Sequence, residues 1–71
     1  MEINQPSPDA AETAMLVMLS RDAVNDAEHT GHSAIKFHGY LIECDRLPHQ
    51  CLIQIKCAGQ LLSKQNAWIN P

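Results

Sequence analysis

A change of pattern at residues 29–31 divides the chain into two parts that favour different secondary structures. Residues 9–28 contain no glycine or proline and consist mainly of alanine, methionine, leucine and acidic residues, a composition typical of a helix. Gly31 then supplies the left-handed residue with which helices commonly end. Beyond it, β-branched and aromatic residues are frequent, as they are in strands. The chain is therefore predicted to be an α+β domain whose helix comes first.

The helix is predicted to cover residues 7–29, and two start signals overlap at its beginning. Ser7 can cap the helix with Pro8 at the first helical position. Alternatively, Asp9 can act as the cap, with Glu12 three residues later as its reciprocal partner. Both alternatives place the start of the helix within the same short stretch.

The middle of the predicted helix is apolar on two sides. On a helical projection, one side forms the stripe expected to pack on the core, which comprises Leu16, Leu19, Ala23 and Ala27, flanked by Ser20 and Val24. The other side carries Ala11, Ala14, Met15 and Met18. Two interpretations of this second side stay open. It is either a scatter of surface methionines, or a helix–helix dimer seam or partner surface, for which small alanines and adaptable methionines are suited.

The second half of the chain, residues 33–69, is predicted to form an antiparallel β-hairpin followed by a third strand. The hairpin strands are residues 34–44 and 50–57, and the turn is centred between Leu47 and Pro48, because proline cannot continue a strand ladder. This register places four pairs on the face that the helix covers: Cys44 with Cys51, Ile42 with Ile53, Tyr40 with Ile55, and His38 with Cys57. The opposite face collects Phe37, Leu41, Glu43, Leu52, Gln54 and Lys56.

Residues 61–69 can form either a third strand or a short helix after the break at Ala58 and Gly59. The strand is favoured because three strands with a packed helix are the smallest such assembly that is usually stable alone. The predicted fold is thus one N-terminal helix packed on a three-stranded antiparallel β-meander. It forms a single small domain over residues 1–71, which begins with a flexible tail at residues 1–6.

The size and charge of the chain narrow the classes of function. With 71 residues, the domain has room for a modest core, which argues against a self-sufficient enzyme with a deep substrate pocket. Residues 1–28 carry a net charge of −5 and residues 29–71 a net charge of +2. The four scattered cations of the second half do not favour nucleic acid as a partner. Because a basic N-terminal region and a long apolar run are both absent, the chain is predicted to be cytoplasmic, with no membrane partner.

Seven potential soft metal ligands occur within 29 residues: His29, His32, His38, Cys44, His49, Cys51 and Cys57. Zinc sites usually draw their ligands from close pairs such as Cys-x-x-Cys, and the sequence has no Cys-x-x-Cys pair. His29 and His32 are closely spaced, but they straddle the predicted helix end at Gly31, where a cation is simply favourable, and are weak as a ligand pair. Alternating cysteines are also typical of a small β core, so they are interpreted as reduced and structural, and no metal or cofactor is predicted. The pair most like a catalytic dyad is His38 with Cys57, but it has no assignable orienting acid or oxyanion donor. No catalytic residue is predicted.

These observations favour a small non-enzymatic protein-binding module. It would be a regulator or inhibitor of bacterial or phage type that occludes the surface of a partner protein and forms a homodimer. The apolar surface left over by one core supports this hypothesis. The predicted contacts are Ala11, Ala14, Met15 and Met18 on the helix, and Phe37, Leu41 and Leu52 on the second face of the sheet. The alternative is a small Cys/His metal-binding or nucleic-acid-associated module.

Overall fold

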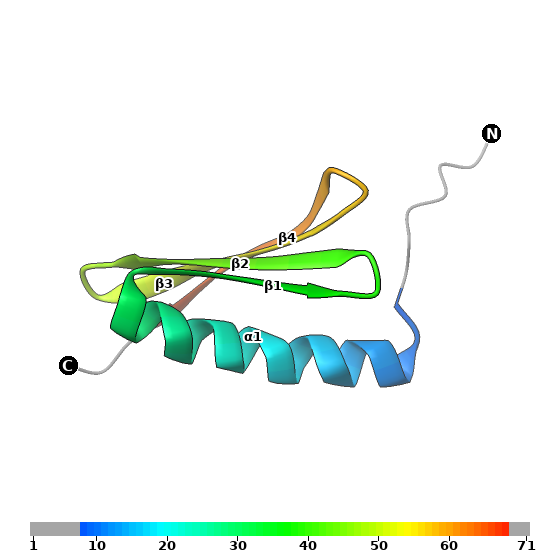
Figure 1. Cartoon of the computed structure of the whole chain (residues 1–71), viewed down its shortest axis with the longest axis horizontal. Helices are drawn as coiled ribbons and strands as arrows, with labels where there is room; N and C mark the ends of the chain where they lie inside the picture. The colour runs from blue at the N-terminus through cyan, green and yellow to red at the C-terminus, as the bar shows by residue number, and fades with distance from the viewer. Residues whose placement is uncertain (1–7, 69–71) are drawn as a thin grey trace.

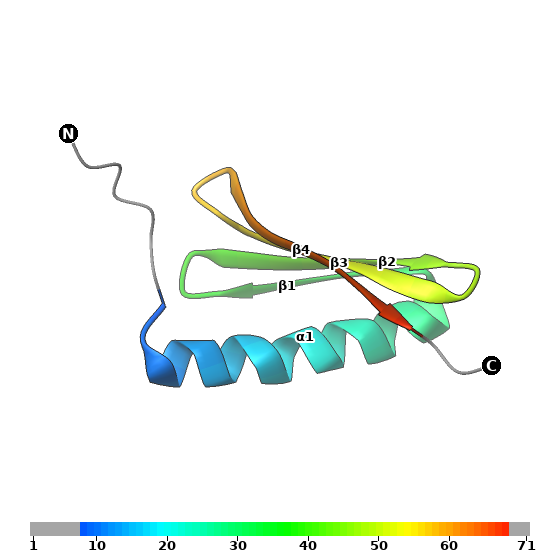
Figure 2. The same cartoon turned by 180° about the vertical axis from the view of Figure 1, so that it is seen from behind.

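The computed structural model describes residues 8–68, which form one helix and four strands. Helix α1 (Ala10–Thr30) is followed by β1 (His32–Phe37), β2 (Tyr40–Leu47), β3 (Gln50–Cys57) and β4 (Gln60–Trp68). The strands form one antiparallel sheet in the order β1-β2-β3-β4, and α1 lies across one face of it (Figures 1 and 2). The predicted α+β class is confirmed. The prediction of three strands is wrong, because the meander has four.

The N-terminus of α1 is fixed by one of the two start signals in the sequence. The Asp9 side chain accepts a hydrogen bond from the backbone N–H of Glu12 at 2.8 Å, and the Glu12 carboxylate accepts one from the backbone N–H of Asp9 at 3.2 Å. This reciprocal capping box satisfies two backbone donors that the helix itself leaves free. The helix therefore begins at Ala10, later than the predicted range 7–29, while Ser7 and the predicted tail lie outside the described residues.

The C-terminus of α1 ends as expected, at a left-handed glycine. Gly31 has φ 92°, and its N–H donates to the carbonyl of Ala27 at 2.8 Å. The β2 strand secures this end, because the Arg46 guanidinium donates to the carbonyl of Glu28 at 2.8 Å and the Arg46 backbone N–H donates to the carbonyl of Gly31 at 2.9 Å. The last turn of the helix is thus tied to the sheet by hydrogen bonds.

The strand missing from the prediction arises at the start of the sheet, from a tight turn at His38 and Gly39. These two residues have φ of 47° and 82°, the conformation of the turns that match the twist of a β-hairpin. The stretch predicted as one strand, residues 34–44, is therefore split into β1 and β2, with Phe37 opposite Tyr40. His38 lies in the turn, so its predicted pairing with Cys57 is wrong.

The hairpin of β2 and β3 is centred one residue later than predicted. Its two-residue turn is Pro48 and His49, which makes Leu47 the partner of Gln50. This arrangement puts Pro48 at the first turn position, which its fixed φ favours, whereas the predicted register puts it at the disfavoured second position. The predicted pairs are corrected to Cys44 with Ile53, Ile42 with Ile55, Tyr40 with Cys57 and Arg46 with Cys51. Since each partner shifts by two positions, the same side chains still face the helix.

The core lies between α1 and the first three strands. Its buried members are Leu16, Ala23, Ala27, Tyr40, Ile42, Cys44, Cys51 and Ile53. Leu19 and Val24 pack against them from the helix, so the predicted core stripe of the helix is confirmed. Alternate residues of β2 and β3 supply the sheet side of this core, as period-two alternation requires.

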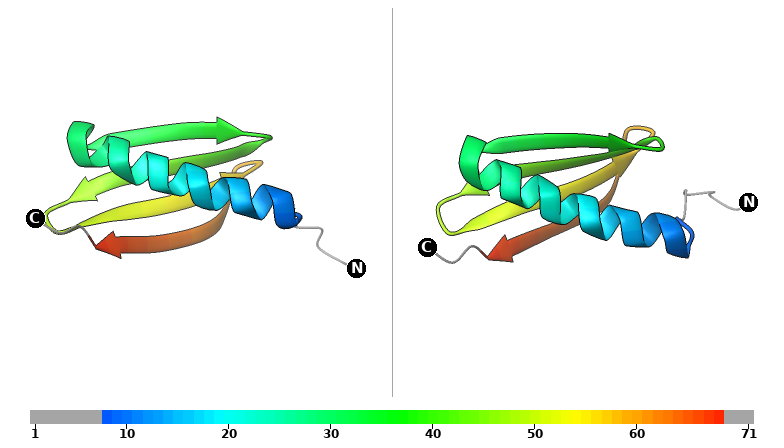
Figure 3. Two further views of the ribbon diagram at one scale, coloured as in Figure 1. Left: turned by 90° about the horizontal axis from the view of Figure 1, so that it is seen from below. Right: turned by 60° about the horizontal axis from the view of Figure 1, so that its bottom comes forward.

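Small residues bring α1 close to the sheet at β1 and β2. Ala23 and Ala27 are both 0% exposed, and the Ser33 hydroxyl of β1 donates to the carbonyl of Ala23 at 2.6 Å. The helix packs mainly on β1 and β2 and to a smaller extent on β3. It crosses the sheet obliquely, and β4 lies beside the helix and not beneath it (Figure 3).

A larger side chain at this contact should destabilise the fold. We expect Ala23→Leu to lower the free energy of unfolding by about 1–3 kcal/mol, because the added methyl groups must displace the sheet or the helix. The matched control Ala14→Leu, at an exposed position of the same helix, should change it by less than about 0.5 kcal/mol. Urea denaturation followed by circular dichroism measures both, and equal effects of the two substitutions would contradict the packing described.

Candidate functional site

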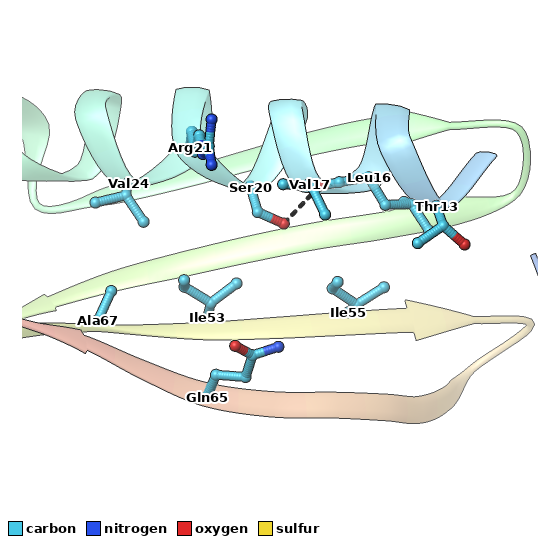
Figure 4. Close-up of a pocket in the computed structure, with 10 residues that line it drawn as sticks. All are labelled: Thr13, Leu16, Val17, Ser20, Arg21, Val24, Ile53, Ile55, Gln65 and Ala67. Atoms are coloured by element: carbon cyan, nitrogen blue, oxygen red, sulfur yellow. Dashed lines mark hydrogen bonds between the residues drawn. The ribbon is translucent and has the colours of Figure 1, made fainter. Parts of the chain in front are cut away.

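A groove runs between α1 and the uncovered part of the sheet (Figure 4). Its volume is about 500 Å³, within the range of small-ligand and side-chain binding sites. Its apolar walls are Leu16, Val17 and Val24 of the helix, Ile53 and Ile55 of β3, and Ala67 of β4.

The groove exists because β4 presents small or polar side chains where the helix does not reach. Gln65 and Ala67 of β4 line it, and they pair with Ile53 and Cys51 of β3. No bulky apolar side chain of β4 fills the space above these positions. Val17 on the flank of the core stripe therefore stays 48% exposed.

The polar groups of the groove are few. They are Thr13, Ser20, Arg21 and Gln65. The Ser20 hydroxyl is engaged, since it donates to the carbonyl of Leu16 at 2.7 Å (Figure 4). Arg21 is the one charged residue that lines the groove, and the salt bridges within residues 8–68 join His32 to Asp45 and Lys56 to Glu43 without involving it. The groove is thus apolar with one available cation at its rim.

The contacts predicted on the helix lie elsewhere. Ala11, Ala14, Met15 and Met18 are exposed on the side of α1 that faces away from the sheet, and none of them lines the groove. Met15 is 39% and Met18 57% exposed. They form a convex surface, whose role as a dimer seam or partner surface stays a prediction.

The residues predicted as contacts on the sheet do not all lie on the same face of it. Leu41 and Leu52 lie half-buried on the face away from α1, as expected. Phe37 does not join them, because the turn at residues 38–39 places it opposite Tyr40, where it packs against the core. The predicted position of Phe37 on the second face is therefore wrong.

The main groove residues were not among the predicted contacts. Val17 and Val24 are seven residues apart on one flank of the helix, so their shared side was detectable from helical periodicity. The prediction that Ile53 and Ile55 lie on the face of the sheet that the helix covers is confirmed. The sequence carries no signal that the helix stops short of β4, since the tilt of a helix on a sheet depends on tertiary packing.

The cysteine and histidine residues do not converge. Within residues 8–68, no three side chains among His, Cys, Asp and Glu lie close enough to hold a metal ion. Cys44 and Cys51 are buried on the helix side of the sheet, and Cys57 is partly buried near its other end. His32 instead pairs with Asp45, with 2.6 Å between the His32 Nδ1 and the Asp45 carboxylate, on the exposed face.

The environment of Cys44 suppresses its reactivity. Burial, followed by the hydrogen bond and charge of neighbouring Cys51, raises the pKa of the Cys44 thiol from its ordinary value of 9.0 to about 12. The thiolate is the reactive form of cysteine. Cys44 is therefore held as a neutral thiol at physiological pH, and it acts as a core side chain.

The thiols should differ in their reaction with Ellman's reagent. In the native protein at pH 8, we expect Cys57 to react first and Cys44 and Cys51 to react at least about a hundredfold more slowly, because both are buried and the thiolate of Cys44 is suppressed. In urea all three should react at one rate. Absorbance time courses on wild type and Cys57→Ser measure this, and a fast phase retained by Cys57→Ser would contradict the assignment.

Comparisons with known protein families, with curated proteins and with solved structures found no match to the chain. Over residues 8–68, no helix combines the length and the apolar character that crossing a membrane requires. The groove is therefore the feature from which a function is inferred.

Proposed function

We propose that this chain is a small protein-binding module whose groove takes an apolar segment of a partner protein. The single observation that carries this proposal is the groove of about 500 Å³ between α1 and β4. Binding energy at protein interfaces concentrates where an apolar anchor enters a pocket from which water is excluded. Leu16, Val24 and Ile55 provide walls for such an anchor.

Arg21 specifies the chemistry of the partner segment. It lies at the rim of the groove and makes no salt bridge within residues 8–68. A guanidinium at the edge of an apolar site favours a carboxylate, which it can bind with two parallel hydrogen bonds. The expected ligand is therefore an apolar segment that carries an acidic residue at one end.

The groups that line the groove favour binding over catalysis. No acid, histidine or cysteine is among the residues of 8–68 that line it, and the Ser20 hydroxyl is already bonded to the helix backbone. General acid–base and nucleophilic mechanisms need such groups within reach of each other. We therefore propose a regulator or inhibitor that acts by covering the surface of its partner, with no bond made or broken.

Selection from a random peptide library displayed on phage tests this proposal. Peptides selected on the wild-type protein should be apolar with an acidic residue. Their dissociation constants should rise at least about tenfold for Val17→Asp, which puts a charge in the groove, and for Arg21→Glu, which reverses the charge at its rim. Isothermal titration calorimetry with synthetic peptides measures the change.

Met18→Asp is the matched control, since it adds the same charge to the same helix on the side away from the groove. It should leave peptide affinity within about twofold of wild type. Selected peptides that bind Val17→Asp as tightly as wild type would contradict the proposal, and so would a library that yields no binder. Peptides weakened by Met18→Asp alone would assign binding to the convex methionine side.

A further inference from the structure

We propose that β4 pairs in antiparallel orientation with β4 of a second copy of this chain, with Asn66 at the two-fold axis. β4 is at the end of the sheet and its only strand partner is β3, so its outer edge carries N–H and C=O groups without a strand partner in residues 8–68. It is also the longest strand, with nine residues and no proline. A long open edge of this kind is a template for pairing with another strand.

The exposed side chains of β4 suit a second copy. Gln65 and Ala67 face the groove, so alternation puts Lys64, Asn66 and Trp68 on the opposite face of the sheet. Trp68 is 80% exposed, which is unusual for a side chain with so large an apolar surface. With Asn66 opposite Asn66 of the second copy, Lys64 of each chain lies opposite Trp68 of the other. Each ammonium group then meets an indole ring, a favourable cation–π arrangement that the symmetry forms twice.

Charge disfavours one of the alternative registers. Lys64 is the only charged residue of β4. A register centred on Lys64 would place two lysines directly opposite each other, which is destabilising. The register centred on Asn66 separates them by four residue positions along the paired strands and leaves each beside an aromatic ring. The irregularity in the β3–β4 ladder lies at Ile55 and Lys56, toward the other end of β4, so the paired part of the edge is regular.

The pairing is compatible with an open groove. A two-fold axis perpendicular to the sheet relates the two copies without exchanging the faces of the sheet. Both α1 helices therefore lie on the same face of one continuous sheet. The dimer uses the backbone edge of β4 and the face that carries Lys64 and Trp68. The groove uses the face that carries Gln65 and Ala67. The two proposals are therefore independent, because opposite faces of one strand carry them.

Sedimentation equilibrium on the full chain tests the dimer. Wild type should be a dimer, and Lys64→Glu and Trp68→Ala should each raise the dimer dissociation constant at least about fivefold, through loss of the cation–π contacts. Lys36→Glu, an exposed position on the other edge strand β1, is the matched control and should change it less than twofold. Circular dichroism confirms that each variant is folded.

A cysteine cross-link reports the register directly. In a Cys57→Ser background, Asn66→Cys should form a disulfide-linked dimer on mild oxidation, because directly opposite residues of paired strands lie within reach of a disulfide. Ala34→Cys on β1 is the matched control and should stay monomeric on a denaturing gel.

A wild-type protein that sediments as a monomer overturns the proposal. So does a dimer that Lys64→Glu leaves unchanged, or one that Asn66→Cys does not link. If Lys64→Glu is monomeric and still binds the selected peptides, the loss of the dimer is distinguished from a loss of binding in the groove.

Discussion

The close contact of α1 with β1 and β2 determines the shape of the rest of the molecule. Ala23 and Ala27 are fully buried, and such small side chains let the helix axis approach the sheet more closely than leucine or methionine would. The hydrogen bonds from Ser33 to Ala23 and from Arg46 to Glu28 fix the C-terminal half of the helix to these two strands. With its C-terminal half held there, the helix cannot also cover β4, and the groove is the consequence.

Local interactions compensate for the small core of so short a chain. Three of the helix residues are buried, and local devices supply the remaining order. The capping box at Asp9 and the glycine at position 31 define both ends of the helix. Two-residue turns then join every pair of neighbouring strands. Loops as short as these lose less entropy on closure than longer ones would.

Much of the fold could be predicted from the sequence because its signals are local. Periodicity in a short window of sequence predicts the helix and its core stripe. It also predicts which residues of β2 and β3 face the helix. The turn at His38 was missed because its glycine lies within a run of strand-forming residues, which reads as one continuous strand. That omission moved Phe37 to the wrong face, because a two-residue turn resets the alternation that an unbroken strand would continue.

The groove could not be predicted in the same way, because it depends on how far α1 extends across the sheet. Val17 and Ile53 are 36 positions apart in sequence, and no local pattern relates them. The helix side that the sequence did single out, with Met15 and Met18, is apolar but convex. Convex apolar surface can be covered only by a partner shaped to it, whereas a groove supplies its own walls and excludes water from whatever it holds. The shape of the surface therefore favours the groove as the binding site, whereas composition alone favours the side of the helix that carries Met15 and Met18.

Alternation along β4 allows one strand to contribute to two surfaces. Gln65 and Ala67 face the groove, whereas Lys64 and Trp68 face the other side. Filling the groove with a larger residue on β4 would bury more apolar surface, but it would leave the helix without an open flank. Shortening or charging the edge would protect it from pairing, as many edge strands are protected. The regular part of β4 is not shortened, and Lys64 is the single charge on it. The open edge and the open groove of this strand are the two features on which the proposed binding of a second copy and of a partner segment depend.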